Sequence, residues 1–256
     1  MNVLRTYRSA GTIRSAQAVS AQGGFGLIEL MISLAVASFL VLGLVVMAGN
    51  TQRTYSTQTD LAGVGDKERF AMEVFGNAIE TAGYFTIAAP ITAVPSVNNA
   101  LVASATGGAT YVAGQSMAGT SGPPDTFNVR FQSANDPNSP SNCQGGTVAA
   151  TATHTYESVF SIVNGNLVCA VGIDNGAPGA AVVLIDGVSN MSILYGVDTL
   201  GDVASTNEYV PASTVNANNW WGKVRVVKIT LTFASTANLP PVSFTQSIQV
   251  MHGYSH

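Results

Sequence analysis

A long apolar run near the N-terminus constrains this chain more than any other feature. Residues 25–48 form a run of 24 residues in which Glu29 is the only charged side chain. As a helix this run is roughly 36 Å long, at about 1.5 Å per residue, and a bilayer core is about 30 Å thick. A secretory signal peptide cut after Ala48 is the alternative, but its apolar region spans only about 7–15 residues. The run therefore predicts a membrane-spanning helix.

Charge is distributed unevenly on the two sides of this run. The first 24 residues carry three arginines and no acid, whereas the remaining residues carry seven basic and fourteen acidic side chains, a net charge of −7. Arginines before a membrane helix place the N-terminus in the cytoplasm and the rest of the chain on the exported side, the periplasm of a Gram-negative bacterium. Because so few cations cannot neutralise many phosphates, no direct nucleic-acid partner is expected.

The start of the apolar run carries a recognisable motif. A buried carboxylate at Glu29 is costly in hydrocarbon unless it is paired or lies at headgroup level. Residues 23–31 read Gly-Gly-Phe-Gly-Leu-Ile-Glu-Leu-Met and resemble the type IV prepilin signature, with Gly26 where that family usually has Thr. The resemblance implies cleavage between Gly24 and Phe25, N-methylation of Phe25, and an assembly role for Glu29 as the partner of a Phe25 amine.

The residues that follow predict a helix that continues beyond the membrane. Apolar residues recur at helical spacing on one face, which favours packing on a globular head; they are Ala71, Val74, Phe75, Ala78, Ile79 and Ala82. Gly83 is a natural helix stop. Four glycines earlier in the helix suggest bends or melted turns: Gly43, Gly49, Gly63 and Gly65.

The remainder of the chain is predicted to be rich in strands. Apolar runs flank Asn164-Gly165, a strong hairpin signal. Further strands are expected at 125–131, at 181–188 and 190–197 around Asp186-Gly187, and at 223–233 and 243–251. A long helix followed by antiparallel strands is an α+β order, and the resemblance implies a type IV pilin fold in which the helix packs on an antiparallel sheet.

Three further segments resemble the PilW group of minor pilins. They are Glu68-Arg69-Phe70-Ala71 with residues 82–85, the strand pair at 184–188 and 194–198, and the strand at 224–232. The resemblance implies a minor pilin that primes or joins type IV pilus assembly at the tip, in support of pilus biogenesis, twitching motility, adhesion or DNA uptake. It implies as partners other minor and major pilins, the prepilin peptidase, the inner-membrane assembly platform and the membrane itself. The protein would lie in the inner membrane before assembly and in the pilus afterwards.

This interpretation divides the chain into four parts. A leader peptide at 1–24 precedes a membrane and filament-core helix at 25–48, a periplasmic amphipathic helix at 49–83 and a β-rich head at 84–256. Two alternatives remain: a minor pseudopilin of a type II secretion system, and a membrane-tethered periplasmic binding domain.

The two cysteines, Cys143 and Cys169, both fall on the exported side, where thiols oxidise. We predict a disulfide between them that stabilises the head by roughly 3 kcal/mol. The alternative is a pair of unpaired buried thiols.

Other chemistry is sparse. Asp198 and Asp202 lie in a glycine-containing loop that is a weak candidate for calcium, but Leu200 stands where another acid would help, so no metal is expected. Trp220-Trp221 suggests either a protein contact or edge packing of the head. We find no catalytic or nucleotide-binding motif, and therefore expect neither an enzyme nor a cofactor.

Overall fold

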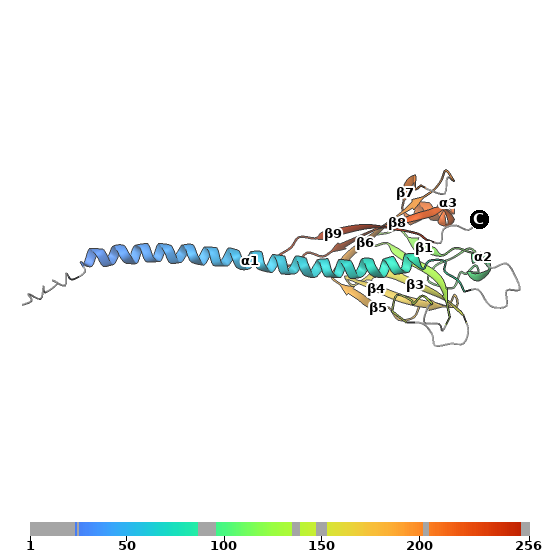
Figure 1. Cartoon of the computed structure of the whole chain (residues 1–256), viewed down its shortest axis with the longest axis horizontal. Coiled ribbons are helices and arrows are strands. Elements are labelled where there is room, and N and C mark those ends of the chain that lie inside the picture. Colours follow the sequence, from blue (N-terminus) through green and yellow to red (C-terminus); the bar gives the residue numbers. More distant parts are fainter. Residues whose placement is uncertain are drawn as a thin grey trace, which may run out of the picture. The chain divides into compact units, whose positions relative to one another are not determined.

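The computed structural model describes residues 24, 26–86, 96–134, 139–146, 153–201 and 205–251. The chain divides into two units, Met1–Gln52 and Arg53–His256. One long helix comes first, and antiparallel strands with a few short helices follow it (Figure 1). This order confirms the α+β class that the sequence predicts.

The first element, α1 (Leu27–Glu80), is a helix of 54 residues. It runs through all four glycines without a break, so the expected melted turns are absent from it. A glycine costs only about 1 kcal/mol relative to alanine in a helix interior, which a long helix tolerates. The helix ends where predicted, because Gly83 has a φ of 81°, the left-handed conformation that closes many helices.

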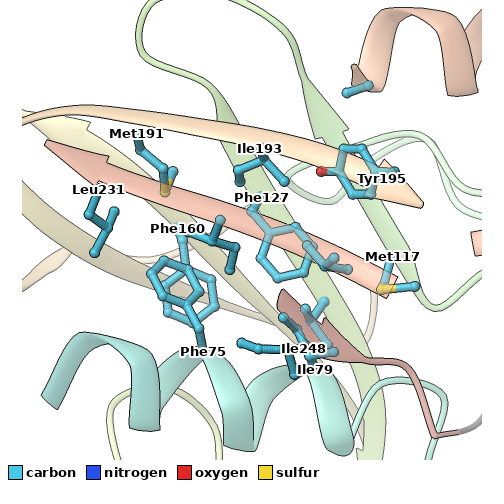
Figure 2. Close-up of a cluster of buried hydrophobic side chains, with 14 of the residues drawn as sticks. Phe75, Ile79, Met117, Phe127, Phe160, Met191, Ile193, Tyr195, Leu231 and Ile248 are labelled. Atoms are coloured by element: carbon cyan, nitrogen blue, oxygen red, sulfur yellow. The ribbon is translucent and has the colours of Figure 1, made fainter. Parts of the chain in front are cut away.

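Residues 53–80 of α1 belong to the second unit and contribute one face to its core. Ala71, Phe75 and Ile79 are fully buried, as their spacing predicts. Figure 2 shows Phe75 and Ile79 pointing from the helix towards the strands. The ring centres of Phe75 and Phe160 are 4.8 Å apart, so the helix is part of the core of this unit.

The strands form two antiparallel sheets. The five-stranded sheet has the order β1-β2-β3-β4-β5 and the four-stranded sheet the order β7-β6-β8-β9. The first comprises β1 (Met117–Thr120), β2 (Thr126–Ser133), β3 (His154–Val163), β4 (Asn166–Ile173) and β5 (Val182–Asp186). The second comprises β6 (Val188–Val197), β7 (Glu208–Val210), β8 (Val224–Phe233) and β9 (Val242–Gln249). Both sheets contribute side chains to one buried cluster, which includes Phe127, Phe160, Met191, Ile193 and Leu231 (Figure 2).

The Asn-Gly signal is confirmed at the turn between β3 and β4. Asn164 has a φ of 50° and Gly165 a φ of 74°, and a two-residue hairpin turn with positive φ at both positions matches the right-handed twist of its strands. The predicted strands at 223–233 and 243–251 also pair, as β8 with β9.

The two strands predicted around Asp186-Gly187 are present as β5 and β6, but their pairing differs from the strand pair that the resemblance implies. They do not form a pair: β5 pairs with β4, whereas β6 pairs with β7 and β8. Gly187 lies between them with a φ of 79° and carries the chain from one sheet to the other. The local sequence contains the turn signal, but pairing partners depend on residues that are far away in the chain.

Three short helical segments complete the described elements. They are α2 (Val97–Ala100), α3 (Ala212–Asn218) and a 3-10 turn, η1 (Trp221–Lys223). The side-chain oxygen of Ser96 accepts a hydrogen bond from the Asn99 amide at the start of α2, which is a typical N-cap.

Candidate functional site

The predicted processing and assembly residues cluster at the start of α1. Gly24 is exposed, and Phe25 lies outside the described residues. The carbonyl of Gly26 accepts hydrogen bonds from the amides of Glu29 (3.0 Å) and Leu30 (3.2 Å), which form the first turn of the helix. Glu29 therefore lies in the first turn of α1, where the helix dipole favours a negative charge.

The apolar part of α1 exposes its side chains in the part of the chain that the structure describes. Its large apolar side chains from Leu27 to Met47 are between 54% and 79% exposed. Within the described residues, α1 is also the one helix that is long and apolar enough to cross a membrane. Apolar patches of this extent are rare on soluble monomers and mark contacts with a membrane or with other proteins.

Cys143 and Cys169 are joined in a disulfide. Their Cα atoms are 6.3 Å apart, and 26 residues separate them in the chain. Cys169 lies on β4, while Cys143 lies in the segment 139–146. The side-chain amide of Gln144 also donates to the carbonyl of Cys169 at 3.0 Å, so two adjacent residues attach this segment to β4.

A hollow of about 360 Å³ lies beside this disulfide, within the second unit. Apolar side chains from α1 and β5, among them Phe70, Val74 and Leu184, form much of its lining, and Asn142 and Gln144 contribute polar groups. The sequence alone did not indicate this hollow, because its walls come from segments that are distant in the chain.

In the candidate calcium loop, the carboxylate of Asp198 contacts other groups of the protein. The side chain of Asp198 is almost fully buried, with one oxygen accepting from the Gly201 amide at 2.7 Å. Its other oxygen lies 3.9 Å from a terminal nitrogen of Arg225. Asp202 lies outside the described residues. Among the described residues, no group of three or more His, Cys, Asp or Glu side chains could hold a metal ion.

The two tryptophans have different environments. Trp221 is buried, its indole nitrogen donates to the side chain of Asn216 at 2.8 Å, and its ring lies edge-on to Tyr195 at 5.0 Å. Trp221 therefore packs in the head, as one of the two interpretations proposed. Trp220 remains partly exposed.

A buried polar layer was not expected from the sequence. Arg130 and Glu157 face each other across β2 and β3, and each is at most 3% exposed. Glu157 accepts hydrogen bonds from the Tyr111 hydroxyl (2.6 Å), the Gly108 amide (2.6 Å) and the Asn128 side chain (2.9 Å). These donors satisfy a carboxylate that would otherwise be costly to bury.

Arg130 also contacts the segment at residues 101–116, which we call the covering segment. Its guanidinium donates to the carbonyls of Gln115 (2.7 Å) and Val102 (3.0 Å), and to the side chain of Asn175 (3.2 Å). Burial lowers the pKa of Arg130, and burial together with the nearby Glu157 carboxylate raises the pKa of Tyr111. The layer thus attaches residues 101–116, which carry no charge, to the outer face of the five-stranded sheet. The polar layer therefore has a structural role, and its described residues form no open site for a substrate.

Two models of known protein families match this chain, one near its N-terminus and one over most of its strands. The family model for the type IV pilus-assembly protein W, PilW, matches residues 152–253, and the model for the prokaryotic N-terminal methylation motif matches residues 19–45. The first match covers β3 to β9, and the second covers Gly24, Phe25, Glu29 and most of the exposed apolar part of α1. Curated proteins provide no match to this chain.

A solved structure is also similar. It is a type IV-like pilin from Thermus thermophilus, with 12% sequence identity and a TM-score of 0.40, and the similarity covers 73% of this chain and 95% of that one.

Proposed function

We propose that this chain, a PilW-like type IV minor pilin, primes or joins pilus assembly as a subunit at the tip. Proteins of this family are structural components of the pilus and not enzymes. They interact with other pilins and with the pilus machinery. The protein is anchored in the inner membrane by the apolar part of α1 before it enters the pilus.

The observation that carries the proposal is the division of α1 into an exposed apolar part and a part that belongs to the head. Residues 27–47 expose their apolar side chains, whereas Ala71, Phe75 and Ile79 are buried against strands. The exposed part needs lipid before assembly and the apolar helices of other subunits afterwards. Both environments remove it from water.

The proposed processing follows from the residues at the helix start. Prepilin peptidase would cut between Gly24 and Phe25, and Phe25 would then be N-methylated. The new amine would lie four residues before Glu29, about one helical turn away. In an apolar bundle a lone carboxylate is costly, so the amine of Phe25, from its own or a neighbouring subunit, is the proposed partner. Such a pair favours a particular register more than it adds stability.

The proposal also includes specific partner proteins. Besides the peptidase, we propose that the inner-membrane assembly platform receives the mature subunit and that other minor pilins surround it. Cations on the exported part are few, which is why we propose no direct nucleic-acid partner.

The mass of the N-terminal peptide of protein isolated from its native host tests the processing. A peptide that starts at Phe25 and carries one added methyl group is the expected result. An intact leader, or a start at Gly49, would remove the filament role.

A substitution tests the assembly role separately. Glu29→Ala should leave membrane insertion intact and reduce incorporation into sheared pili, because the amine loses its partner. Ser33→Ala is a suitable control: it lies one turn later, and its hydroxyl only donates to the Glu29 carbonyl at 2.7 Å. Normal incorporation of the Glu29→Ala subunit would contradict the proposal.

A further inference from the structure

The accessible lysine and arginine side chains of residues 84–256 lie close together in the chain. Residues 84–256 contain four basic side chains, namely Arg130, Lys223, Arg225 and Lys228. Arg130 is 1% exposed and belongs to the buried polar layer. The other three lie within six consecutive residues, at the beginning of β8 and in the turn just before it. Within the described part of residues 84–256, the exposed lysine and arginine side chains therefore lie on β8 and in the turn just before it.

Each lysine of this group lies beside an aromatic ring. The ammonium of Lys228 is 5.8 Å from the centre of the Tyr209 ring, and that of Lys223 is 6.0 Å from the Trp220 ring. Tyr209 is 46% exposed. We call these four residues, Tyr209, Trp220, Lys223 and Lys228, the cation–aromatic patch.

The lysines carry the free charge of the patch. Arg225 is only 15% exposed and lies 3.9 Å from the buried carboxylate of Asp198. In the part of the chain that the structure describes, neither lysine pairs with a carboxylate. Glu208 precedes Tyr209 on β7, and successive residues of a strand point to opposite faces, so its carboxylate is directed away from the Tyr209 ring.

The strands beside Lys228 are rich in hydroxyl groups. Lys228 lies opposite Ser247 in the pairing of β8 with β9. Further along the same two strands, the hydroxyls of Thr230 and Thr245 are 2.8 Å apart, and those of Thr232 and Ser243 are 2.9 Å apart. These groups can exchange hydrogen bonds with a polar ligand that lies along the strands.

The spacing of the lysines favours an extended ligand with sparse negative charge. Lys223 ends η1 and Lys228 is the fifth residue of β8, so at about 3.3 Å per residue the backbone between them extends over at most roughly 16 Å. A ligand that extends along the strand can contact both ammonium groups. A nucleic acid carries far more charge over this length, about one phosphate per 1.7 Å of duplex. The phosphates that the two lysines do not neutralise would be repelled by a mature chain of net charge −7.

We infer that the cation–aromatic patch binds an acidic polysaccharide. Sugar rings offer apolar C–H faces that stack on Tyr209 and Trp220, carboxylates that contact the lysines, and hydroxyls that match the Ser and Thr side chains of β8 and β9. An acidic polypeptide offers carboxylates but lacks the flat C–H faces and the dense hydroxyl groups. The inference rests on the proposed function, in which the head is displayed outside the membrane, and it specifies a ligand class for adhesion.

Binding of polygalacturonate to the mature full chain in detergent micelles tests the inference. Dextran, oligothymidylate and poly-glutamate serve as neutral, nucleic-acid and acidic-polypeptide comparisons. Polygalacturonate should bind more tightly than all three, and added salt should weaken the binding, because exposed charges are screened over about 8 Å at physiological salt. No preference for polygalacturonate, or tighter binding of oligothymidylate or poly-glutamate, would overturn the inference.

Matched variants locate the binding. Lys223→Gln and Lys228→Gln should each weaken it roughly three- to fivefold, as expected for one exposed charge contact. Arg69→Gln removes the same charge from α1, at a side chain that is 83% exposed, and should have no effect. Tyr209→Leu should weaken binding by a similar factor at low and at high salt, because stacking is not screened. Equal losses for Arg69→Gln and Lys228→Gln would contradict the assignment.

Filament incorporation separates this inference from the proposed function. Lys228→Gln subunits should enter sheared pili at the normal level, and a loss of incorporation would reassign the patch to a subunit contact and overturn the inference. An unprocessed N-terminus would instead overturn the proposed function and leave the binding of polygalacturonate by the purified chain unaffected.

Discussion

The guanidinium of Arg130 lies 3.9 Å from the centre of the Tyr111 ring, and both side chains are at most 2% exposed. The Tyr111 hydroxyl donates to Glu157 at 2.6 Å. One aromatic residue of the covering segment therefore contacts a buried cation with its ring and a buried anion with its hydroxyl. This arrangement lets β2 and β3 carry opposite charges inside the head.

Tyr111→Phe should destabilise the head by about 1–3 kcal/mol. The substitution keeps the ring under Arg130 but removes one of the three donors to Glu157, and an undersatisfied buried carboxylate is costly. Denaturant unfolding of the wild type and the variant gives this difference. A change below about 0.5 kcal/mol would mean that a water molecule replaces the lost donor.

Tyr195→Phe applies the same chemical change with the opposite expected sign. The Tyr195 hydroxyl is fully buried and has no hydrogen-bond partner among the described residues. Its removal should therefore be neutral or raise the melting temperature, because the folded state no longer buries an unpaired polar group. A clear drop in the melting temperature would indicate a partner for this hydroxyl.

Both tyrosines also predict how stability depends on alkaline pH. Burial raises the pKa of Tyr111 and of Tyr195 above the ordinary value of about 10. Between the unfolded and folded pKa values, the unfolded state has lost a proton that the folded state retains. The free energy of unfolding therefore does not depend on the titration of these tyrosines below about pH 10 and falls as the pH rises above it. Tyr111→Phe and Tyr195→Phe should each make this decline shallower, by about 1.4 kcal/mol in total when the unfolding free energy is compared at pH 9 and at pH 11. An unchanged slope in both variants would contradict the assignment.

Local signals in the sequence were sufficient for much of this fold. The spacing of Ala71, Phe75 and Ile79 identified the buried face of α1, and Asn164-Gly165 identified the β3–β4 hairpin. Both are properties of residues that are close together in the chain. The motif around Phe25 and Glu29 likewise needs only a few adjacent residues, and a family model matches it.

Other features depend on contacts between distant segments. The Asp186-Gly187 signal predicted a turn, but the sequence does not show that β5 and β6 belong to different sheets. The polar layer escaped prediction for a related reason. Arg130 and Glu157 are separated by 27 positions, and each lies in a strand whose apolar neighbours dominate the local pattern. Only their pairing across β2 and β3 reveals that both charges are buried.

Removal of the disulfide should cost about 3 kcal/mol. A bridge that closes a loop of this length restricts the unfolded chain by roughly that amount in the chain-entropy model. Cys143→Ser combined with Cys169→Ser should lower the denaturant midpoint accordingly. Reductant should lower the wild-type midpoint to a similar value and leave the variant unaffected. Equal midpoints of the wild type and the double variant would show that the bridge adds no stability.

The ion pair between Lys67 and Asp186 should contribute only modestly and only above acidic pH. The Lys67 ammonium lies 2.9 Å from Asp186 and holds the pKa of that carboxyl below its ordinary value. A depressed folded pKa gives stability that is present above the unfolded pKa of about 4 and is lost as pH falls through the folded one. Because the carboxylate is 73% exposed, Asp186→Asn should cost less than about 1 kcal/mol at pH 7, and the difference should vanish near pH 2. A difference that persists there would have to come from packing.

Phe75 and Phe70 provide a test of the part that α1 plays in the head. Both lie on the same helix, but Phe75 is fully buried whereas Phe70 is 49% exposed beside the hollow. Phe75→Ala should destabilise the head by about 3–5 kcal/mol, because it leaves a cavity among the rings of Phe127 and Phe160. Phe70→Ala should cost much less, since its side chain already contacts water. Comparable losses in the two variants, measured by denaturant unfolding, would mean that the hollow beside Phe70 is closed in solution; a small loss for Phe75→Ala would mean that the strands form a stable core without this helix.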